Sequence, residues 1–408
     1  MSAFFSSLRH CLEANAPPER KDFMDSAKMP IIKPTISILA TVLGLIALLL
    51  GPLPPALHGA GLSEEEMKLI NTAVEQIRGH ALVAPKSTRK MTEDILRAYA
   101  HSIDEYTDYL TSEEYAAYQE SSSSDYFGVQ MDIQKKDGSI LLFPFKGGLA
   151  ENSRIKAGDE LIAVNGSPVF GKSVYVVGAQ IRGAEGMTVQ LTLRTGQGIP
   201  RVLTLRRHKT NYESVSWKTA GATHFIQISR FAKNTEEQLR HALETIGADG
   251  TIVVDLRRNQ GGSLRIAWEC ADLFLEKGTV LFKLRSRDET KEIVADQPQR
   301  IGNRVILIQD GSTASAAEAF VAALTRNGRA LSVGRKSFGK GLAQRFLSLP
   351  DGSALLLTYA EIITPDNVGY HNQGLEPELR LPEELIEEDF FQDGSLSRLL
   401  DFIKMHQK

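Results

Sequence analysis

Apolar positions change their spacing along the chain, and each spacing predicts a different kind of element. Over residues 62–118 they recur every three or four residues, in MKLINTAVEQI and again in MTEDILRAYAHSI, which predicts amphipathic helices. Over residues 126–206 they form short β-type runs, such as ELIAVNG and TVQLTLR, separated by Gly and Asn turns. One helical stretch, at residues 173–181, interrupts these strands. The pattern predicts a helical region followed by a small β-rich module.

From residue 211 onward, strands and helices alternate. FIQISRF, TIVVDLR, RVILIQD and ALSVG are predicted strands, and helices are expected over residues 235–246, 264–275 and 316–325. A hairpin follows, in which Asp351 and Gly352 turn QRFLSL into ALLLTYAEII. Alternation of this kind predicts a mainly parallel sheet whose functional loops lie at the carboxyl ends of its strands.

We therefore expect a mixed α+β chain of several domains. The chain has 408 residues, of which 42% are hydrophobic, and this leaves room for two or three domains. The expected divisions are an export segment, a helical N-terminal region, the β-rich module, an αβ core of strand-helix units and a C-terminal helix, over residues 1–60, 61–122, 123–208, 209–390 and 391–408. A formal net charge of -3, with acids and bases interspersed, gives no basic face for nucleic acid.

The first sixty residues have the pattern of an export signal. Residues 36–50 are an uncharged apolar run, preceded by Lys28 and Lys33. The run is short for a membrane span of ~20 residues and fits the core of a secretory signal. Cleavage after Ala60, an uncleaved membrane anchor and an alternative start at Met29 remain open. We expect an exported protein, periplasmic or otherwise extracytoplasmic, or one anchored to the inner membrane.

The two cysteines fall on opposite sides of this apolar run. Cys11 precedes it and Cys270 lies far beyond it, so no intramolecular disulfide is expected. Cys270 stands in an apolar-periodic stretch and is predicted to be a core residue, not a nucleophile.

Two loops follow predicted strands: RNQGG at residues 258–262 and GSTASAAE at residues 311–318. Ser315 stands where a helix is expected to begin, so the amide of Ala316 would be an unpaired donor of the first turn. An oxyanion beside Ser315 would meet that donor and the positive end of the helix. Gly261 and Gly262 would let the other loop approach a ligand and offer a second amide. Taken singly, Ser315 could also be an ordinary helix cap, and the glycine pair an ordinary tight turn.

A serine nucleophile needs a base. Among nine histidines, His371 in VGYHNQG is the only loop histidine close to these loops, and a Ser-His-Asp arrangement remains open. Lys340, in VGRKSFGKGLAQ, is the better candidate. Burial would have to lower its pKa from ~10.4 by several units for it to act as a base near neutral pH. Gln344 lies four residues on in an extended segment, and its amide oxygen can accept a hydrogen bond from the amine without adding a charge.

Two other motifs overlap Lys340. Gly334, Gly339 and Lys340 fit the start of a nucleotide-binding P-loop, but Gly341 stands where that loop needs Ser or Thr for magnesium, and the AQRFLSL that follows is predicted to be a strand. Ser337 and Lys340 give Ser-x-x-Lys, which other enzymes place on one helical turn, and Gly339 disfavours such a helix. We expect no nucleotide, cofactor or metal.

Several segments together resemble those of the carboxyl-terminal processing proteases, also called tail-specific proteases. They span about residues 106–377 and are, in order, DYLTSEEY, YFGVQM, IKAGDELIAVNG, DLRRNQGG, GSTASAAEAF, VGRKSFGKGLAQ and GLEPE. One segment would be weak evidence, but this order and spacing are highly specific. The chain departs from the family at Gln260, because proline commonly follows the asparagine that corresponds to Asn259.

The resemblance implies a role for each matching residue. Ser315 would be the nucleophile, Lys340 the general base and Gln344 the residue that positions the lysine. The amides of Ala316 and of Gly261 or Gly262 would form the oxyanion hole, with the choice between the glycines open. Glu318 matches a glutamate of the serine motif and is expected to be structural.

The resemblance also implies that residues 123–208 form a PDZ domain. The loop at residues 124–129 would receive the carboxylate of a protein's C-terminus, and the site residues expected there are Tyr126, Phe127, Gly128 and Val129. The helix near residues 173–181 would form the other wall of an apolar groove.

The expected protein is thus an exported serine endopeptidase that binds protein tails. The alternative is a non-catalytic adaptor that captures C-termini and uses the protease-like core as a scaffold. A homo-oligomer, a regulatory partner and attachment to the membrane through an uncleaved N-terminal segment also remain open.

Overall fold

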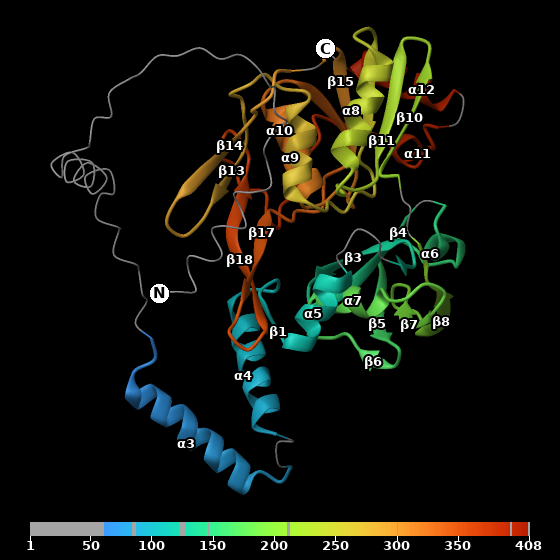
Figure 1. Cartoon of the computed structure of the whole chain (residues 1–408). Coiled ribbons are helices and arrows are strands. Elements are labelled where there is room, and N and C mark those ends of the chain that lie inside the picture. Colours follow the sequence, from blue (N-terminus) through green and yellow to red (C-terminus); the bar gives the residue numbers. More distant parts are fainter. Residues whose placement is uncertain are drawn as a thin grey trace, which may run out of the picture. The chain divides into compact units, whose positions relative to one another are not determined.

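The structure is a computed structural model that describes residues 61–83, 87–121, 127–145, 147–209, 213–299, 301–391 and 394–406 (Figure 1). The chain divides into two compact units, Met1–Ala84 and Pro85–Lys408. In the first unit the described residues form helix α3 (Glu64–His80), which begins with a capping box between Ser63 and Glu66. The apolar run at residues 36–50 lies outside the described part of the chain. None of the described helices is long and apolar enough to cross a membrane.

The second unit begins with two helices that flank a short strand. These are α4 (Thr88–Ile103), β1 (Asp108–Leu110) and α5 (Ser112–Ser121). Strand β1 pairs with the long strand β18 (Ala354–Ile363), which forms a hairpin with β17 (Leu342–Ser348), orange to red in Figure 1. The same antiparallel sheet also contains β13 (Val280–Arg285) and β14 (Thr290–Val294). The helical N-terminal region therefore contributes strand β1 to the sheet that contains β17, the strand directly after Lys340.

The β-rich module is a separate antiparallel sheet with its own core. Its strands, in spatial order, are β3 (Met131–Lys136), β4 (Ser139–Pro144), β5 (Asp159–Val164), β7 (Thr188–Arg194) and β8 (Arg201–Arg206). The smaller elements are α6 (Leu149–Asn152), α7 (Val174–Ile181), β6 (Ser167–Pro168), β2 (Phe127–Gly128) and β9 (His208–Lys209). Leu142, Leu161 and Leu191 pack with Val177 of α7 in its interior. Strand β3 is an edge strand with β4 as its only neighbour among the described strands.

The protease-like core is built on a six-stranded sheet that is parallel except for its first strand. The strands, in spatial order, are β10 (Val215–Ala220), β11 (Thr223–Ile228), β12 (Thr251–Asp255), β15 (Arg304–Gln309), β16 (Ala330–Gly334) and β19 (Leu379–Arg380). Each central strand is apolar on both sides because both faces are covered. The predicted strand-helix core and the mixed α+β class are confirmed.

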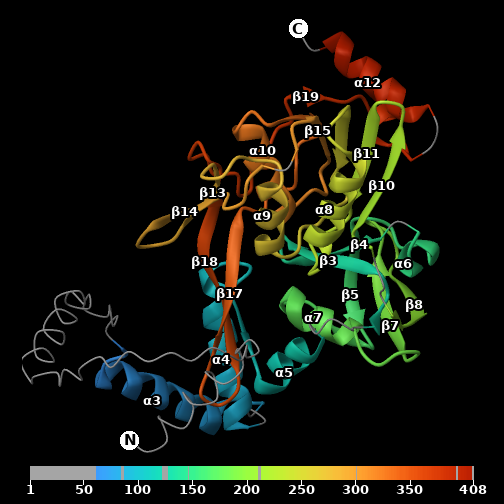
Figure 2. The same cartoon turned by 45° about the horizontal axis from the view of Figure 1, so that its top comes forward.

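Two groups of helices cover this sheet on opposite faces (Figure 2). One group is α8 (Thr235–Ile246), α9 (Leu264–Asp272) and α10 (Ala316–Arg326), and the other is α11 (Glu383–Ile386) and α12 (Ser395–His406). The alternation of side chains along β12 shows this directly, since Val254 packs in the first cluster and Val253 in the second. Helix α9 ends at Asp272, three residues before the predicted end.

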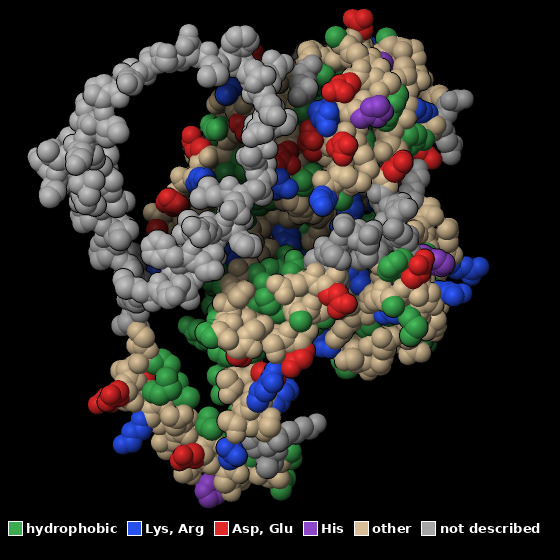
Figure 3. Space-filling model, in the orientation of Figure 1, with side chains coloured by type: hydrophobic (Ala, Val, Ile, Leu, Met, Phe, Trp, Pro, Cys, Tyr) green, Lys and Arg blue, Asp and Glu red, His purple; other side chains and the backbone are tan. Residues whose placement is uncertain are grey.

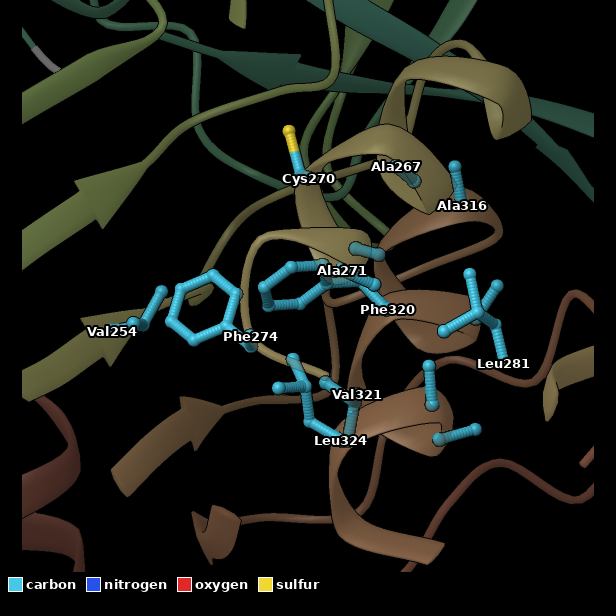
Figure 4. Close-up of a cluster of buried hydrophobic side chains, with 14 of the residues drawn as sticks. Val254, Ala267, Cys270, Ala271, Phe274, Leu281, Ala316, Phe320, Val321 and Leu324 are labelled. Carbon is cyan, nitrogen blue, oxygen red and sulfur yellow. The ribbon is translucent and has the colours of Figure 1, made fainter. Parts of the chain in front are cut away.

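Cys270 is a residue of α9 and belongs to the core cluster that α9 shares with α8 and α10 (Figure 4). Its thiol is free and fully buried, in the same apolar cluster as Phe274 and Phe320. Burial in these apolar surroundings raises the pKa of the thiol well above its ordinary value. The prediction of a core cysteine is confirmed.

Acidic and basic side chains are intermingled over the face of the molecule drawn in Figure 3, as the interspersed charges of the sequence predict.

Candidate active site

Ser315 lies at the junction between strand β15 and helix α10. It is the N-cap residue of α10 and has φ 55° and ψ -119°, a conformation that costs energy in a residue with a side chain. Such strain persists only where neighbouring contacts hold it. Gly261 is one of these neighbours, because a Cβ on it would lie 2.8 Å from the Ala314 carbonyl oxygen and 3.0 Å from the Ser315 Cβ.

Glu318 joins the serine loop to the lysine loop. Its Oε2 accepts hydrogen bonds from the backbone amides of Ser315 and Lys340, both at 2.8 Å. Its Oε1 accepts from the Ser337 hydroxyl at 2.5 Å and from the Gly339 amide at 2.7 Å. The carboxyl group is fully buried, and burial raises its pKa against the opposing effect of these four donors. Glu318 therefore has the structural role expected for it, because its carboxylate connects the two loops through hydrogen bonds to their backbone amides.

Lys340 has an amine suited to accept a proton. Enclosure of the side chain lowers the pKa of the amine to about 8, against weaker opposing effects of the Glu105 and Glu318 carboxylates. The Nζ lies 4.9 Å from the centre of the Tyr106 ring. It forms no hydrogen bond with Ser315 or Gln344 among the described residues. Catalytic hydrogen bonds often form only after substrate is bound, so the lack of one here does not exclude proton transfer from Ser315 to Lys340.

Gln344 is the third predicted residue of the site, at a bulge in the pairing of β17 with β18. Its Nε2 donates to the Thr358 hydroxyl at 3.4 Å, and this hydroxyl donates to Asp104 Oδ1 at 3.1 Å. Its side chain therefore contacts β18, and its predicted hydrogen bond to Lys340 is not made in this state.

The two glycines of the neighbouring loop differ in what their amides do. The Gly261 amide donates to Asn259 Oδ1 at 2.9 Å, so it is already paired. The amide of Gly262 finds no acceptor among the described residues, and neither does the amide of Ala316. Gly262, but not Gly261, lines the cavity in front of Ser315. A Cβ on Gly262 would lie 2.4 Å from the Phe231 carbonyl oxygen, which explains the need for glycine there as well.

The departure from the family at Gln260 has a structural counterpart. The side-chain Nε2 of Gln260 donates to the Ser312 backbone carbonyl at 2.7 Å. The backbone carbonyl of Gln260 accepts from Gln134 Nε2 of β3 at 2.8 Å. These bonds connect the glycine loop to the serine loop and to the β-rich module.

One cavity of about 600 Å³ connects the β-rich module with the three predicted catalytic side chains. Strand β3 and helix α7 line one part, and Ser315, Lys340 and Gln344 line another. Gly128 and Val129 also line it, whereas Phe127 does not. The Phe127 carbonyl accepts from the Gly183 amide at 3.2 Å, and Tyr126 lies outside the described residues.

The alternative uses of this region find little support in the geometry. Lys340 lies in an irregular segment that leads directly into strand β17, so neither a P-loop helix nor a Ser-x-x-Lys helical turn is present there. The Nδ1 of His371 has no hydrogen-bond partner among the described residues, and the ring instead contacts Tyr106 edge-on. Sequence reasoning did not single out Tyr106 or Thr358, because both meet the site only through the tertiary fold.

Comparisons with known proteins agree with this architecture. Residues 223–381 match the model of "Peptidase family S41". A "Probable CtpA-like serine protease" of Staphylococcus haemolyticus (strain JCSC1435) is 34% identical over 285 residues, which are 68% of this chain and 57% of that protein. A protein of the same description from Staphylococcus aureus (strain bovine RF122 / ET3-1) gives the same identity and coverage. The match thus spans a little over half the length of these relatives.

A solved structure shares the fold. The "photosystem II D1 C-terminal processing protease" superposes with a TM-score of 0.66 at 24% sequence identity, over 81% of this chain and 96% of that one. This similarity extends beyond the matched family domain to most of the described chain. The chain belongs to peptidase family S41, the serine peptidase family of the C-terminal processing proteases.

Proposed function

We propose that the chain is an exported serine endopeptidase that captures the C-terminal tails of proteins on a PDZ domain and cleaves them with a Ser315–Lys340 dyad. The observation that carries the proposal is the shared cavity, in which a serine at a helix N-terminus and a lysine with a pKa of about 8 line the same space as an open strand edge.

The first half of the reaction forms an acyl-enzyme. The neutral Lys340 amine takes the proton of the Ser315 hydroxyl as its Oγ attacks the scissile carbonyl carbon. The amides of Gly262 and Ala316 donate to the oxyanion of the tetrahedral intermediate. When this intermediate collapses, the C–N bond breaks, and the Lys340 ammonium gives its proton to the leaving amine. The C-terminal fragment departs, and the lysine is neutral again.

The second half returns the enzyme to its starting state. Lys340 takes a proton from a water molecule, whose oxygen attacks the ester carbonyl of the acyl-enzyme. The same two amides donate to the second oxyanion. Collapse of this intermediate breaks the ester bond, and the proton returns from Lys340 to the Ser315 oxygen. The N-terminal fragment leaves with a new C-terminal carboxylate.

Tail capture is assigned to the β-rich module. An edge strand such as β3 can pair with an added extended peptide. Backbone amides near its start can receive the terminal carboxylate, which is the role proposed for residues 126–129. Val174 and Ile181 of α7 offer apolar contacts across the same groove. We therefore expect substrates with apolar C-terminal side chains. Export rests on the apolar run at residues 36–50, and N-terminal sequencing of the protein from the extracytoplasmic fraction tests it.

The test uses the full chain, Ser315→Ala and Lys340→Ala on a long unstructured peptide with an apolar free C-terminus. A matched peptide with an amidated C-terminus is the control for tail capture. Mass spectrometry identifies the products, and circular dichroism checks that each variant folds. We expect both variants to lose about 10³-fold or more in kcat. The amidated peptide should be cleaved more slowly.

The outcomes separate the proposal from its rivals. Full activity in either folded variant would refute the dyad. Tight binding of the free-tailed peptide by a wild type that leaves it intact would favour the adaptor function.

A further inference from the structure

The loop between α4 and β1 comes from the helical N-terminal region, yet it contacts the base half of the site. The Tyr106 ring lies over the Lys340 amine, with 4.9 Å from the ring centre to Nζ. Asp104 Oδ1 accepts from the Thr358 hydroxyl at 3.1 Å, and this hydroxyl accepts from Gln344 Nε2 at 3.4 Å. Two residues of one loop therefore contact, directly or through Thr358, two residues proposed for catalysis.

The same carboxylate shapes the loop. Asp104 accepts from the amides of Tyr106 and Thr107 at 2.7 and 2.8 Å, and from the Thr107 hydroxyl at 2.7 Å. The Thr107 hydroxyl in turn accepts from the Thr358 amide at 3.2 Å, which fastens the loop to β18. A carboxylate that accepts several charge-assisted hydrogen bonds holds a turn more firmly than neutral partners do. The half-buried Tyr106 is thus held by a turn whose amides donate to the Asp104 carboxylate.

A ring in this position acts on the amine in two opposing ways. Its π-face favours the ammonium form, and its bulk keeps water from the amine, which favours the neutral form. The carboxylates of Glu105 and Glu318 act on the amine. Asp104 and Asp137 act on Tyr106, and the His371 ring contacts Tyr106 with 6.2 Å between ring centres. Enclosure of the Lys340 amine lowers its pKa to about 8 although both carboxylates raise it, so the exclusion of water outweighs the carboxylates.

We propose that residues 104–107 form a positioning loop for the base, in which Tyr106 shields the Lys340 amine from water and Asp104 holds the Gln344 side chain through Thr358. Tyr106 and Asp104 are positioning residues, since they act on substrate only through Lys340 and Gln344. This inference rests on the proposed function, because it assigns the base role to Lys340. It implies that the segment from α4 to β1 is part of the catalytic unit.

The first experiment measures the amine itself, so that it does not depend on cleavage. The full chain is labelled with ¹³C at lysine Cε, the Lys340 signal is assigned by its loss in Lys340→Arg, and its titration is followed by NMR. Tyr106→Leu removes the ring, Tyr106→Phe keeps it, and Tyr99→Leu removes a tyrosine that is 71% exposed on α4. We expect Tyr106→Leu to raise the midpoint by about 1 unit, toward the ordinary lysine pKa. Tyr106→Phe and Tyr99→Leu should stay near the wild-type midpoint.

The second experiment uses Thr358→Val, which keeps the side-chain volume and removes the hydroxyl between Gln344 and Asp104. We expect kcat to fall about tenfold with KM changed less than twofold, as for an interaction that matters after substrate has bound. Thr358→Ser, which restores the hydroxyl, should recover most of the loss. A merely structural role for Thr358 would lower the melting temperature without this split between kcat and KM.

The results have distinct meanings. An unchanged Lys340 midpoint in folded Tyr106→Leu would overturn the shielding role, and an unchanged kcat in Thr358→Val would overturn the role of Asp104. A wild type that cleaves nothing would contradict the proposed protease function, whereas the titration of the amine would still decide the effect of Tyr106.

Discussion

The two halves of the candidate site are held by different kinds of contact. On the nucleophile side, the backbone around Ser315 is fixed by the buried Glu318 carboxylate, by the close approach of Gly261 and by a helix that is buried along most of its length. On the base side, the Lys340 amine has no hydrogen-bond acceptor among the described residues, and the Gln344 amide makes one hydrogen bond of 3.4 Å, the long end of the range.

The contacts on the first side determine the positions of atoms, whereas those on the second determine the pKa of the amine. The nucleophile side is set by short backbone contacts that allow little adjustment, so errors there displace atoms. In the proposed mechanism, the reactivity of Lys340 depends on how well water is kept from its amine and on the charges beside it. Substitutions on the first side should therefore lower the rate at every pH, and substitutions on the second that change the charge or the water access of the amine should move the pH dependence.

The largest effect is expected for Glu318→Gln. The amide keeps one acceptor oxygen but presents its NH₂ group to two of the four donors that the carboxylate binds. A buried donor left without an acceptor costs about 1–3 kcal/mol, so two such donors should lower the free energy of unfolding by about 2–6 kcal/mol. We expect kcat/KM to fall about 100-fold or more across the pH range. Chemical denaturation and peptide cleavage measure the two effects.

The control for this change is Glu376→Gln, because that carboxylate is exposed and pairs with Arg380. It should alter neither quantity by much. Full activity in Glu318→Gln would show that the serine and lysine loops hold their positions without the shared carboxylate.

Gly261→Ala should come next in size. The residue has φ +97°, and the added Cβ would meet backbone atoms of the serine loop at 2.8 to 3.0 Å. The loop would have to shift, which would misplace Ser315 and lower kcat about 100-fold with a smaller change in KM. Gly278→Ala is the matched control, since it has φ +89° and nothing within 4 Å of the new Cβ. It should cost about 1 kcal/mol in stability and leave cleavage unchanged.

The pH dependence tests the base side. Because only the neutral amine accepts a proton, kcat/KM should rise with pH to a plateau above an apparent pKa near 8. Below that pH, kcat/KM should fall about tenfold per pH unit.

The stability of the protein should depend on pH for the same reason. The pKa of Lys340 is lower in the folded protein than in the unfolded chain, so the folded protein binds fewer protons between pH 8 and 10.5. The free energy of unfolding should rise through this window, and the rise should be smaller in Lys340→Met.

The smallest change in maximal rate is expected for Gln344→Glu. A carboxylate beside the amine favours the ammonium form, so the pH profile should move about 1 unit to higher pH while the plateau falls only several-fold. Gln344→Ala adds no charge and removes the side chain that Thr358 holds, so it should lower the plateau at least tenfold without moving the profile. A profile that stays in place in Gln344→Glu would show that this side chain does not approach the lysine during the reaction.

The architecture was largely predictable from the sequence, since the spacing of apolar residues predicted the helical region, the β-rich module and the parallel sheet. Helix α8 begins and ends at the predicted residues, and helix α10 begins at the residue after Ser315. The prediction that Ser315, Lys340 and Gln344 share a site relied on the resemblance as well, and they line one cavity. Their chemical roles stay predictions.

The details that escaped the sequence depend on contacts between distant residues. The choice between Gly261 and Gly262 depends on where one asparagine side chain places its oxygen, and no spacing rule encodes that. Tyr106 reaches Lys340 only because β1 pairs with β18. Helix α9 stops early at Asp272, whose carboxylate accepts from the amides of Asp296 and Gln297 in a distant segment.

The unpaired edge of β3 has a consequence for the choice of substrate under the proposed function. Only an extended segment can pair with a strand edge, because its backbone donors and acceptors must be free of any helix or sheet of its own. A tail engaged in its own fold would first have to detach, at a free-energy cost set by the stability of the target protein. Turnover would then report on the folding state of the target, so that damaged or unassembled proteins are degraded ahead of intact ones with the same final residues.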